Sequence, residues 1–327
     1  MKRYRLRSAA FVLALCAFGA AGLAHAQDYP SRRVSIIVPH APGGGVDILS
    51  RMLAADFQER FGQSFVVENR VGGGTLIGAQ SAATAKPDGY TLLVSTVTTL
   101  AINSSIYKQL PYDPVKDFEP ISLLAGAPFV LAVNPSVKAN TVQELIALAK
   151  SQPDKLTYAS AGPGTAHHLY AELFKAMAGV KIRHVPYKGG PPGLSDVVAG
   201  EVSMIFTDVP PALPRMKEGK LRFLAVTPDK RIQVLPDVPT LSEAGLPGYN
   251  AVGWLGLVGP RGIPKPIVDK LNAATRAYMA KPEVEQKLRD TFGMIPMTTT
   301  PEAFAKYIPE EIETWGKVVK AAGIEPQ

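Results

Sequence analysis

The segment VSIIVPHAPGGGVD, residues 34–47, contains the pattern that decides the fold. Its first part is mostly β-branched and ends at a proline, which predicts a short buried strand over Val34–Pro39. Apolar residues then recur at helical spacing, so a helix is predicted from Asp47 to Phe61. The three glycines between them form a turn from strand to helix, a unit typical of α/β proteins.

The same alternation of short apolar stretches and helical patterns continues along the chain. It predicts strands over 65–68, 91–95, 129–133, 156–159, 202–206 and 223–226, and helices over about 76–85, 142–151 and 166–178. Such alternation favours mainly parallel sheets with helices on both faces. From about 264 to 322 the pattern is almost wholly helical (264–281 and 301–322), which suits a return segment that packs across an earlier domain.

Three local signatures predict where helices start. Thr141 with Glu144 and Thr240 with Glu243 have capping-box spacing, in which the hydroxyl and the carboxylate each accept a backbone N–H. Thr300 precedes a proline at the first helical position, which places a third start there.

Composition describes an ordinary globular protein with an N-terminal leader. The chain has 327 residues, 46% apolar and 19% charged, which excludes disorder and a collagen-like chain and predicts two domains. Residues 1–26 combine a basic start, an apolar run and Ala24-His25-Ala26, which predicts a signal peptide cleaved after Ala26. The apolar run is short for a membrane anchor. Without the leader's four basic residues, the chain has 31 basic and 28 acidic residues, and a net charge of +3 does not indicate nucleic-acid binding.

The turn at residues 41–45 has the composition of an anion-binding loop. Glycines let the backbone approach a ligand, and the free N–H groups of the helix start point outward at the positive end of the helix dipole. Asp47 is expected to cap this helix and order the loop. The loop lacks the Gly-x-Gly-x-x-Gly pattern, since position 48 is Ile, and no Gly-Lys-Ser/Thr follows, so neither a dinucleotide nor a nucleotide phosphate is indicated.

Residues 158–168, YASAGPGTAHH, repeat the arrangement in the other half of the chain. Gly162 and Gly164 again separate a predicted strand from a predicted helix, and Thr165 supplies a hydroxyl that alternatively acts only as an N-cap. Two such loops, one in each half, predict a carboxylate bound between two domains. Gly72-Gly73-Gly74-Thr75 is a third, equally flexible glycine run, and the alternative is that it is only a tight turn before its helix.

Enzyme motifs are missing from the sequence. It has no Gly-x-Ser-x-Gly elbow and no His-Glu-x-x-His, and Cys16, the only cysteine, lies in the leader, so no thiol nucleophile, disulfide or thiolate metal site is expected. His167 and His168 are adjacent and diverge on a helix, so no metal site is predicted. We therefore predict a binding protein without cofactor or catalytic residues; a secreted α/β hydrolase is a weaker alternative.

A series of motifs along the mature chain resembles the Bug family, the periplasmic solute-binding proteins of tripartite tricarboxylate transporters. The shared segments are Tyr29-Pro30 and residues 38–47, 67–70 (VENR), 87–93 (PDGYTLL), 110–114 (LPYDP), 158–168, 184–189 (HVPYKG), 236–240 (PDVPT) and 243–247 (EAGLP). The resemblance implies a two-lobed α/β protein of the type II periplasmic class, the Venus flytrap, in which the chain crosses between lobes twice. We assign 27–128 and 231–327 to domain 1 and 129–230 to domain 2.

The resemblance also implies a ligand, partners and a site. In similar proteins a ligand carboxylate lies between the two glycine-rich loops, held by main-chain amides and water, and integral-membrane transporter subunits receive the solute. We expect a monomer. The implied ligand-binding residues here are His40, Ala41, Pro42, Gly43, Gly44, Gly45, Asp47, Ala161, Gly162, Gly164, Thr165, His167 and Asp208.

Some of these positions have more than one interpretation. Asp208 matches an acidic position lining the family's cleft, or it caps the helix that follows. The family commonly has an aromatic or other apolar residue at position 40 and often a polar residue at position 163, where this chain has His40 and Pro163. His167 is at a variable position, whereas His168 follows the family pattern. His40 and His167 either face the ligand from opposite loops or bond to backbone. A sensor that signals to a histidine kinase would use the same closed form, so sensing stays an alternative to transport.

Overall fold

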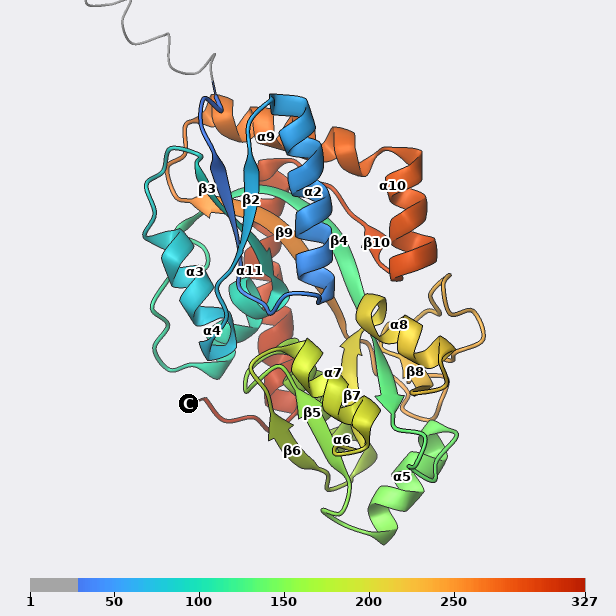
Figure 1. Ribbon diagram of the computed structural model, residues 1–327. Coiled ribbons are helices and arrows are strands. Elements are labelled where there is room, and N and C mark those ends of the chain that lie inside the picture. Colours follow the sequence, from blue (N-terminus) through green and yellow to red (C-terminus); the bar gives the residue numbers. More distant parts are fainter. Residues whose placement is uncertain (1–28, 327) are drawn as a thin grey trace, which may run out of the picture.

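The computed structural model describes residues 29–326, and the predicted signal peptide lies outside these residues (Figure 1). The first half forms β1 (Val34–Val38), α2 (Gly45–Phe61), β2 (Phe65–Asn69), η1 (Gly73–Thr75), α3 (Leu76–Ala83), β3 (Thr91–Thr96), η2 (Thr98–Ile102) and α4 (Asn103–Ile106). The middle forms β4 (Phe118–Val133), α5 (Val142–Ser151), β5 (Thr157–Ser160), α6 (Ala166–Ala178), β6 (Arg183–Pro186), α7 (Gly190–Ala199), β7 (Met204–Asp208), α8 (Val209–Lys217) and β8 (Arg222–Val226). The last part forms β9 (Val252–Pro260), α9 (Lys265–Met279), α10 (Pro282–Lys287), η3 (Leu288–Phe292), β10 (Ile295–Pro296) and α11 (Pro301–Ala321).

The long strand β4 belongs to both lobes. Its residues 118–128 pair with β9, and its residues 129–133 pair with β7 and β8 (Figure 1). The strands follow the order β2-β1-β3-β9-β4 in the first lobe and β4-β7-β5-β6 in the second. The prediction of a two-lobed α/β fold with helices on the sheets is confirmed.

The pairing within each lobe is more mixed than "mainly parallel". β1, β2 and β3 are parallel, as are β5, β6 and β7, while β4 and β9 pair antiparallel with their neighbours. The reason is that β4 leads out of the first lobe and β9 leads back into it, so the two crossing strands run in opposite directions.

The two crossings are hydrogen-bonded side by side at Thr227. Phe129 N–H donates to Thr227 Oγ1 and Thr227 N–H donates to the Phe129 carbonyl, both at 3.0 Å. On the return path, the N–H of Ala251 donates to the Thr227 carbonyl at 3.0 Å. Between Thr227 and Ala251 in the chain, the N–H of Leu241 donates to the carbonyl of Val226, the last residue of β8. The domain limits at 128/129 and 230/231 stay a prediction.

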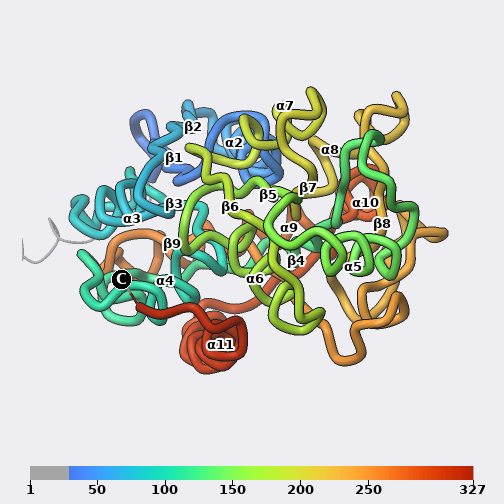
Figure 2. Tube along the Cα trace, turned by 90° about the horizontal axis from the view of Figure 1, so that it is seen from below, coloured from blue at the N-terminus to red at the C-terminus, as the bar shows by residue number. Residues whose placement is uncertain are grey.

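Helix α11 packs across the molecule, in the manner expected for the C-terminal helical segment. It contacts α4 and β4 as well as α6 of the second lobe, and Figure 2 shows it end-on at one edge. Trp315 of α11 stacks on Tyr170 of α6 with 5.6 Å between ring centroids. The indole N–H groups of Trp254 and Trp315 both donate to Glu311, at 2.7 and 2.9 Å. This helix therefore ties β9 and the second lobe together.

The predicted caps form, although one of them does not start a helix. The hydroxyls of Thr141 and Thr300 accept the N–H groups of the third residue on, at 3.1 and 3.2 Å. Thr240 and Glu243 make both bonds of a capping box, but the chain there forms only turns. Among the described helices, none is both long enough and apolar enough to cross a membrane.

Candidate functional site

A cleft of about 320 Å³ lies between the lobes. The first lobe contributes the residues that follow β1, the third glycine run and Tyr107, and the second lobe contributes the loops after β5 and β6. The lining residues are Pro39, His40, Val71–Thr75, Tyr107, Ala161–Pro163, Thr165 and Tyr187–Gly189. Among these described residues there is no Asp or Glu, and Lys188 is the cationic one.

Loops of the two lobes touch across this cleft. A Cβ on Gly189 would lie 2.6 Å from the Cβ of Ala41, and one on Gly74 would lie 3.0 Å from the Pro163 carbonyl oxygen. Deeper between the lobes, the N–H at the start of α6 donates to Thr98 Oγ1 at 3.1 Å. The lobes are therefore closed on each other, and both glycine-rich loops lie at their interface.

Asp47 orders the first loop, as expected, but it does not cap the helix: α2 begins at Gly45 with Gly44 at the N-cap position, so Asp47 lies inside the first turn. Its carboxylate accepts hydrogen bonds from Gly43 N–H at 3.0 Å and Asn69 Nδ2 at 2.9 Å and pairs with Arg51. Asn69 also donates to the His40 carbonyl. Burial opposes ionisation of Asp47, but the bonds from Arg51, Gly43 and Asn69 outweigh it and hold its pKa below the usual value.

Asp208 contacts the first loop from the opposite lobe. Its side chain makes no cap bond to α8, so the helix-cap interpretation is wrong. Instead its carboxylate lies beside the start of α2: a Cβ on Gly45 would lie 3.3 Å from Oδ1, and a Cβ on Gly44 would lie 3.9 Å from Oδ2. Burial raises its pKa to about 6, and the nearby backbone N–H groups of Gly45 and of Asp208 itself partly offset this effect. A carboxylate therefore already lies where the positive end of the α2 dipole favours one.

His40 and His167 line a second, smaller cavity of about 40 Å³ together with Asp208, Thr96 and Phe129. The Nε2 atom of His40 lies 3.3 Å from Thr96 Oγ1, a side-chain rather than a backbone partner. His167 Nε2 is buried and, within the described residues, has no hydrogen-bond partner; it lies 3.9 Å from Asp208 Oδ2. Burial lowers the pKa of His40 to about 4 and, with the His40 charge, that of His167 to about 3. Both rings are thus neutral near pH 7, and the His167–Asp208 contact is not an ion pair.

The second loop is shaped by two glycines with positive φ, Gly162 at 113° and Gly164 at 76°. Gly162 N–H donates to Ser160 Oγ at 3.0 Å, and Gly164 N–H donates to His168 Nδ1 at 3.3 Å. Thr165 stands at the N-cap position of α6, but its hydroxyl donates to the Gly162 carbonyl at 2.7 Å instead of capping the helix. Side chains behind the loop therefore set the direction of its N–H groups.

The predicted site residues fall into groups. His40, Ala161, Gly162 and Thr165 line the cleft, and His40, His167 and Asp208 line the small cavity. The others pack behind or beside these surfaces: Ala41, Gly44, Gly45, Asp47 and Gly164. Pro42 and Gly43 are exposed and line neither space. Their contacts with a ligand stay a prediction.

Sequence reasoning did not assign several residues that line the cleft. The third glycine run is a cleft wall and not only a turn, and Tyr107, Tyr187 and Lys188 were not placed at the site. Tyr187 and Lys188 belong to the HVPYKG motif at residues 184–189, and this motif could have indicated that they lie at the site.

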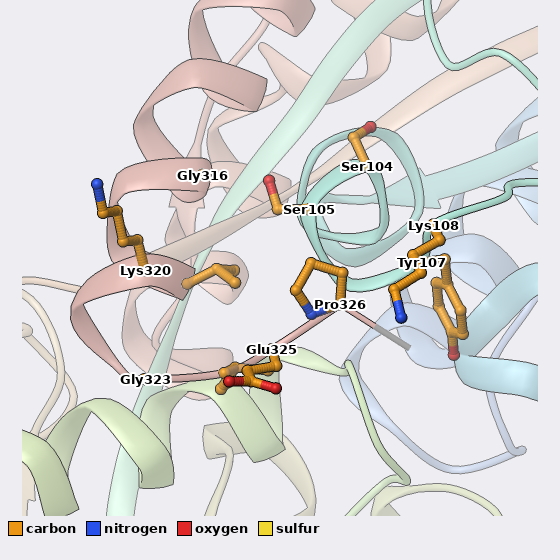
Figure 3. A pocket seen from close by; sticks show the side chains of 11 residues that line it. Ser104, Ser105, Tyr107, Lys108, Gly316, Lys320, Gly323, Glu325 and Pro326 are labelled. Atoms are coloured by element: carbon orange, nitrogen blue, oxygen red, sulfur yellow. The ribbon is translucent and has the colours of Figure 1, made fainter.

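A larger surface groove of about 770 Å³ lies between α4 and the end of α11. Tyr107 lines both this groove and the cleft. Figure 3 shows Lys108, Lys320 and Glu325 pointing in different directions, so the groove lacks convergent polar groups. Across residues 29–326, no group of three or more His, Cys, Asp or Glu side chains is placed to hold a metal ion.

The sequence is similar to a family of receptors and to individual proteins of that family. Residues 49–324 match the family described as "Tripartite tricarboxylate transporter family receptor". Protein BugT of Bordetella pertussis is 35% identical over 93% of this chain and 94% of its own length.

Two solved structures from Rhodopseudomonas palustris are similar over most of the chain. Rpa4515 with adipate has a TM-score of 0.89 and 39% identity, covering 91% of this chain and 100% of that one. MatC (Rpa3494) with bound malate has a TM-score of 0.84 and 34% identity, covering 89% of this chain and 100% of that one. This chain belongs to the tripartite tricarboxylate transporter receptor family, to which the Bug proteins also belong.

Proposed function

We propose that this protein binds a small carboxylate-bearing solute in the cleft between its lobes and delivers it to the membrane subunits of a tripartite tricarboxylate transporter. The observation that carries the proposal is the composition of the cleft. Glycine-rich backbone from both lobes and Lys188 line it, with no acidic side chain among its described lining residues. A lysine without an opposing carboxylate among the lining residues favours an anion. The N–H groups of Gly43, Gly162 and Gly164 are already hydrogen-bonded within the protein, so Lys188 carries this preference.

The relatives support a carboxylate as that anion. The similar structures contain adipate and malate, both dicarboxylates. A volume of about 320 Å³ is at the lower end of small-molecule sites, which fits solutes of this size.

The proposed mechanism is closure of the lobes around the solute. Residues from both lobes line one cleft, so a bound solute contacts the two lobes together only when they are closed. Binding then shifts the equilibrium between open and closed forms towards the closed one. The closed form presents a single composite surface to the transporter.

The remaining parts of the proposal concern cellular context. The protein acts outside the cytoplasm after cleavage of the leader at Ala26, as a monomer, and releases its solute chemically unchanged. The receptor character of the family supports binding without turnover.

A binding screen of the mature protein tests the proposal. We expect thermal shift and calorimetry to detect C4 to C6 dicarboxylates, with Lys188→Met weakening their binding by about tenfold, or about 1.4 kcal/mol. Lys181→Met, at an exposed lysine outside the cleft, is the matched control and should leave affinity unchanged. If no mono- or dicarboxylate binds, or if both variants behave alike, the cleft assignment is wrong.

A further inference from the structure

Three aromatic rings lie in a stack behind the second glycine-rich loop. They come from Tyr158 of β5, His168 of α6 and His184 of β6. The ring centroids are 4.5 Å apart for the two histidines and 4.7 Å apart for Tyr158 and His184. The His168 side chain is only 13% exposed. None of these rings lines the cleft, so a direct contact with the solute does not explain them.

Both imidazoles are hydrogen-bonded to the loop that does line the cleft. His168 Nδ1 accepts the N–H of Gly164 at 3.3 Å. His184 Nε2 lies 2.6 Å from Ser160 Oγ, which itself accepts the N–H of Gly162 at 3.0 Å. The histidine pair thus orients both glycine N–H groups of the turn, one directly and one through a hydroxyl.

The bond to Gly164 defines the protonation state of His168. A backbone N–H only donates, so Nδ1 must keep its lone pair and the ring proton must reside on Nε2. That atom lies 4.0 Å from Glu172 Oε1. A proton added at Nδ1 would place two N–H groups against each other and break the bond. For Ser160 the situation differs, because a hydroxyl accepts from a protonated His184 as well as donating to a neutral one.

The charged and titratable groups around His168 shift its pKa in opposite directions. Glu172 on α6 accepts both the Tyr158 hydroxyl and Lys175 Nζ, the latter at 2.7 Å. Burial lowers the pKa of His168, the Glu172 charge raises it and Lys175 lowers it, with a net downward shift. Burial and His168 together lower the pKa of His184 to about 4. Both rings are therefore neutral near pH 7, the state that the hydrogen bonds require.

We propose that His168 is a positioning residue for ligand binding: its neutral ring holds the Gly162–Thr165 turn in the conformation that faces the cleft, and protonation releases the turn and weakens binding. The inference rests on the proposed function only in that the solute contacts this turn.

The test compares wild-type mature protein with His168→Asn and His168→Leu, using adipate and malate as probes. Asn places a carbonyl oxygen near the position of Nδ1 and does not titrate, whereas Leu fills the space without an acceptor. We expect His168→Asn to bind within about threefold of wild type at pH about 7.5 and His168→Leu about tenfold more weakly. As pH falls to about 5, wild type should lose several-fold more affinity than His168→Asn, because only wild type can be protonated at position 168. Titration of the probe and of other groups affects both proteins alike, so the comparison cancels it.

A second readout needs no ligand. In ¹⁵N-labelled wild type at pH about 7.5, NMR should show His168 in the Nε2–H form. The Nδ1–H form would overturn the proposal, as would equal pH profiles for wild type and His168→Asn. Should wild type bind no carboxylate, the proposed function fails, while the NMR result still decides the state of His168. If His168→Leu does not fold, the His168→Asn profile and the NMR result decide.

Discussion

Replacing Asp208 by asparagine should stabilise the protein at neutral pH and not in acid. Burial raises the pKa of Asp208 from 3.8 to about 6 in the folded protein. At about 1.4 kcal/mol per pKa unit, this shift means that the charged carboxylate costs the folded state about 3 kcal/mol. The asparagine side chain would be neutral, and its carbonyl oxygen would lie beside the Gly45 backbone as Oδ1 does. Its NH₂ group would lie near His167 Nε2, which is 3.9 Å from Asp208 Oδ2 and has no hydrogen-bond partner among the described residues.

The pH dependence gives the prediction its sign. The folded protein holds the Asp208 proton more tightly than the unfolded chain does. The free energy of unfolding therefore falls as pH rises from 3.8 through 6. Asp208→Asn should remove this fall, so that its unfolding free energy exceeds wild type by up to about 3 kcal/mol near pH 7.5 and matches it near pH 3.5.

Urea denaturation of ligand-free protein, followed by tryptophan fluorescence at several pH values, measures this difference. Asp229→Asn is the control, because Asp229 is exposed and should leave the free energy nearly unchanged. A difference between wild type and Asp208→Asn that is constant with pH, or a variant less stable than wild type near pH 7.5, would refute the reasoning.

Two further predictions concern the cleft. Gly189→Ala should weaken carboxylate binding by about tenfold or more, because the new Cβ would lie 2.6 Å from the Cβ of Ala41 in the first loop. The control is Gly179→Ala, since Gly179 also has positive φ but a Cβ there would meet nothing within 4 Å. Equal carboxylate affinities of the two variants would contradict the steric argument. His40→Phe should change the ranking of carboxylates in a thermal-shift screen, because His40 lines both cavities, and an unchanged ranking would show that it does not select the ligand.

Local sequence patterns predicted the strand–turn–helix units well. Helices α5 and α6 have the predicted bounds, and β1 and α2 begin and end within two residues of theirs. In these units the hydrophobic period, a cap or glycines at the turn all indicate the same structure, so no tertiary information is needed.

The first half of β4 and the whole of β9 were the main omissions. The first half of β4 contains Pro120 and Pro128, which argue against a strand, yet the pairing register shifts around Pro120 and accommodates it. β9 has glycines where a strand pattern expects larger residues. A Cβ on Gly256 would lie 2.3 Å from the Phe304 ring of α11, so close packing of a distant helix explains the glycine.

In the candidate site, too, local features could be predicted from the sequence, whereas contacts between distant segments could not. The glycine-rich loops were identified from their composition. The contact of Asp208 with Gly45 and the cleft wall at Gly72–Gly74 arise only when the two lobes meet, and no local pattern encodes which residues then become neighbours. For the same reason, the alternative roles of His40, His167 and Asp208 could not be distinguished from the sequence.

The hydrogen bonds at Thr227 restrict how the lobes can move. Thr227 bonds to Phe129 on the outgoing strand and to Ala251 on the returning chain, so the two connections are joined at one point. A rotation of one lobe against the other would therefore bend both connections together at this junction or break these three hydrogen bonds.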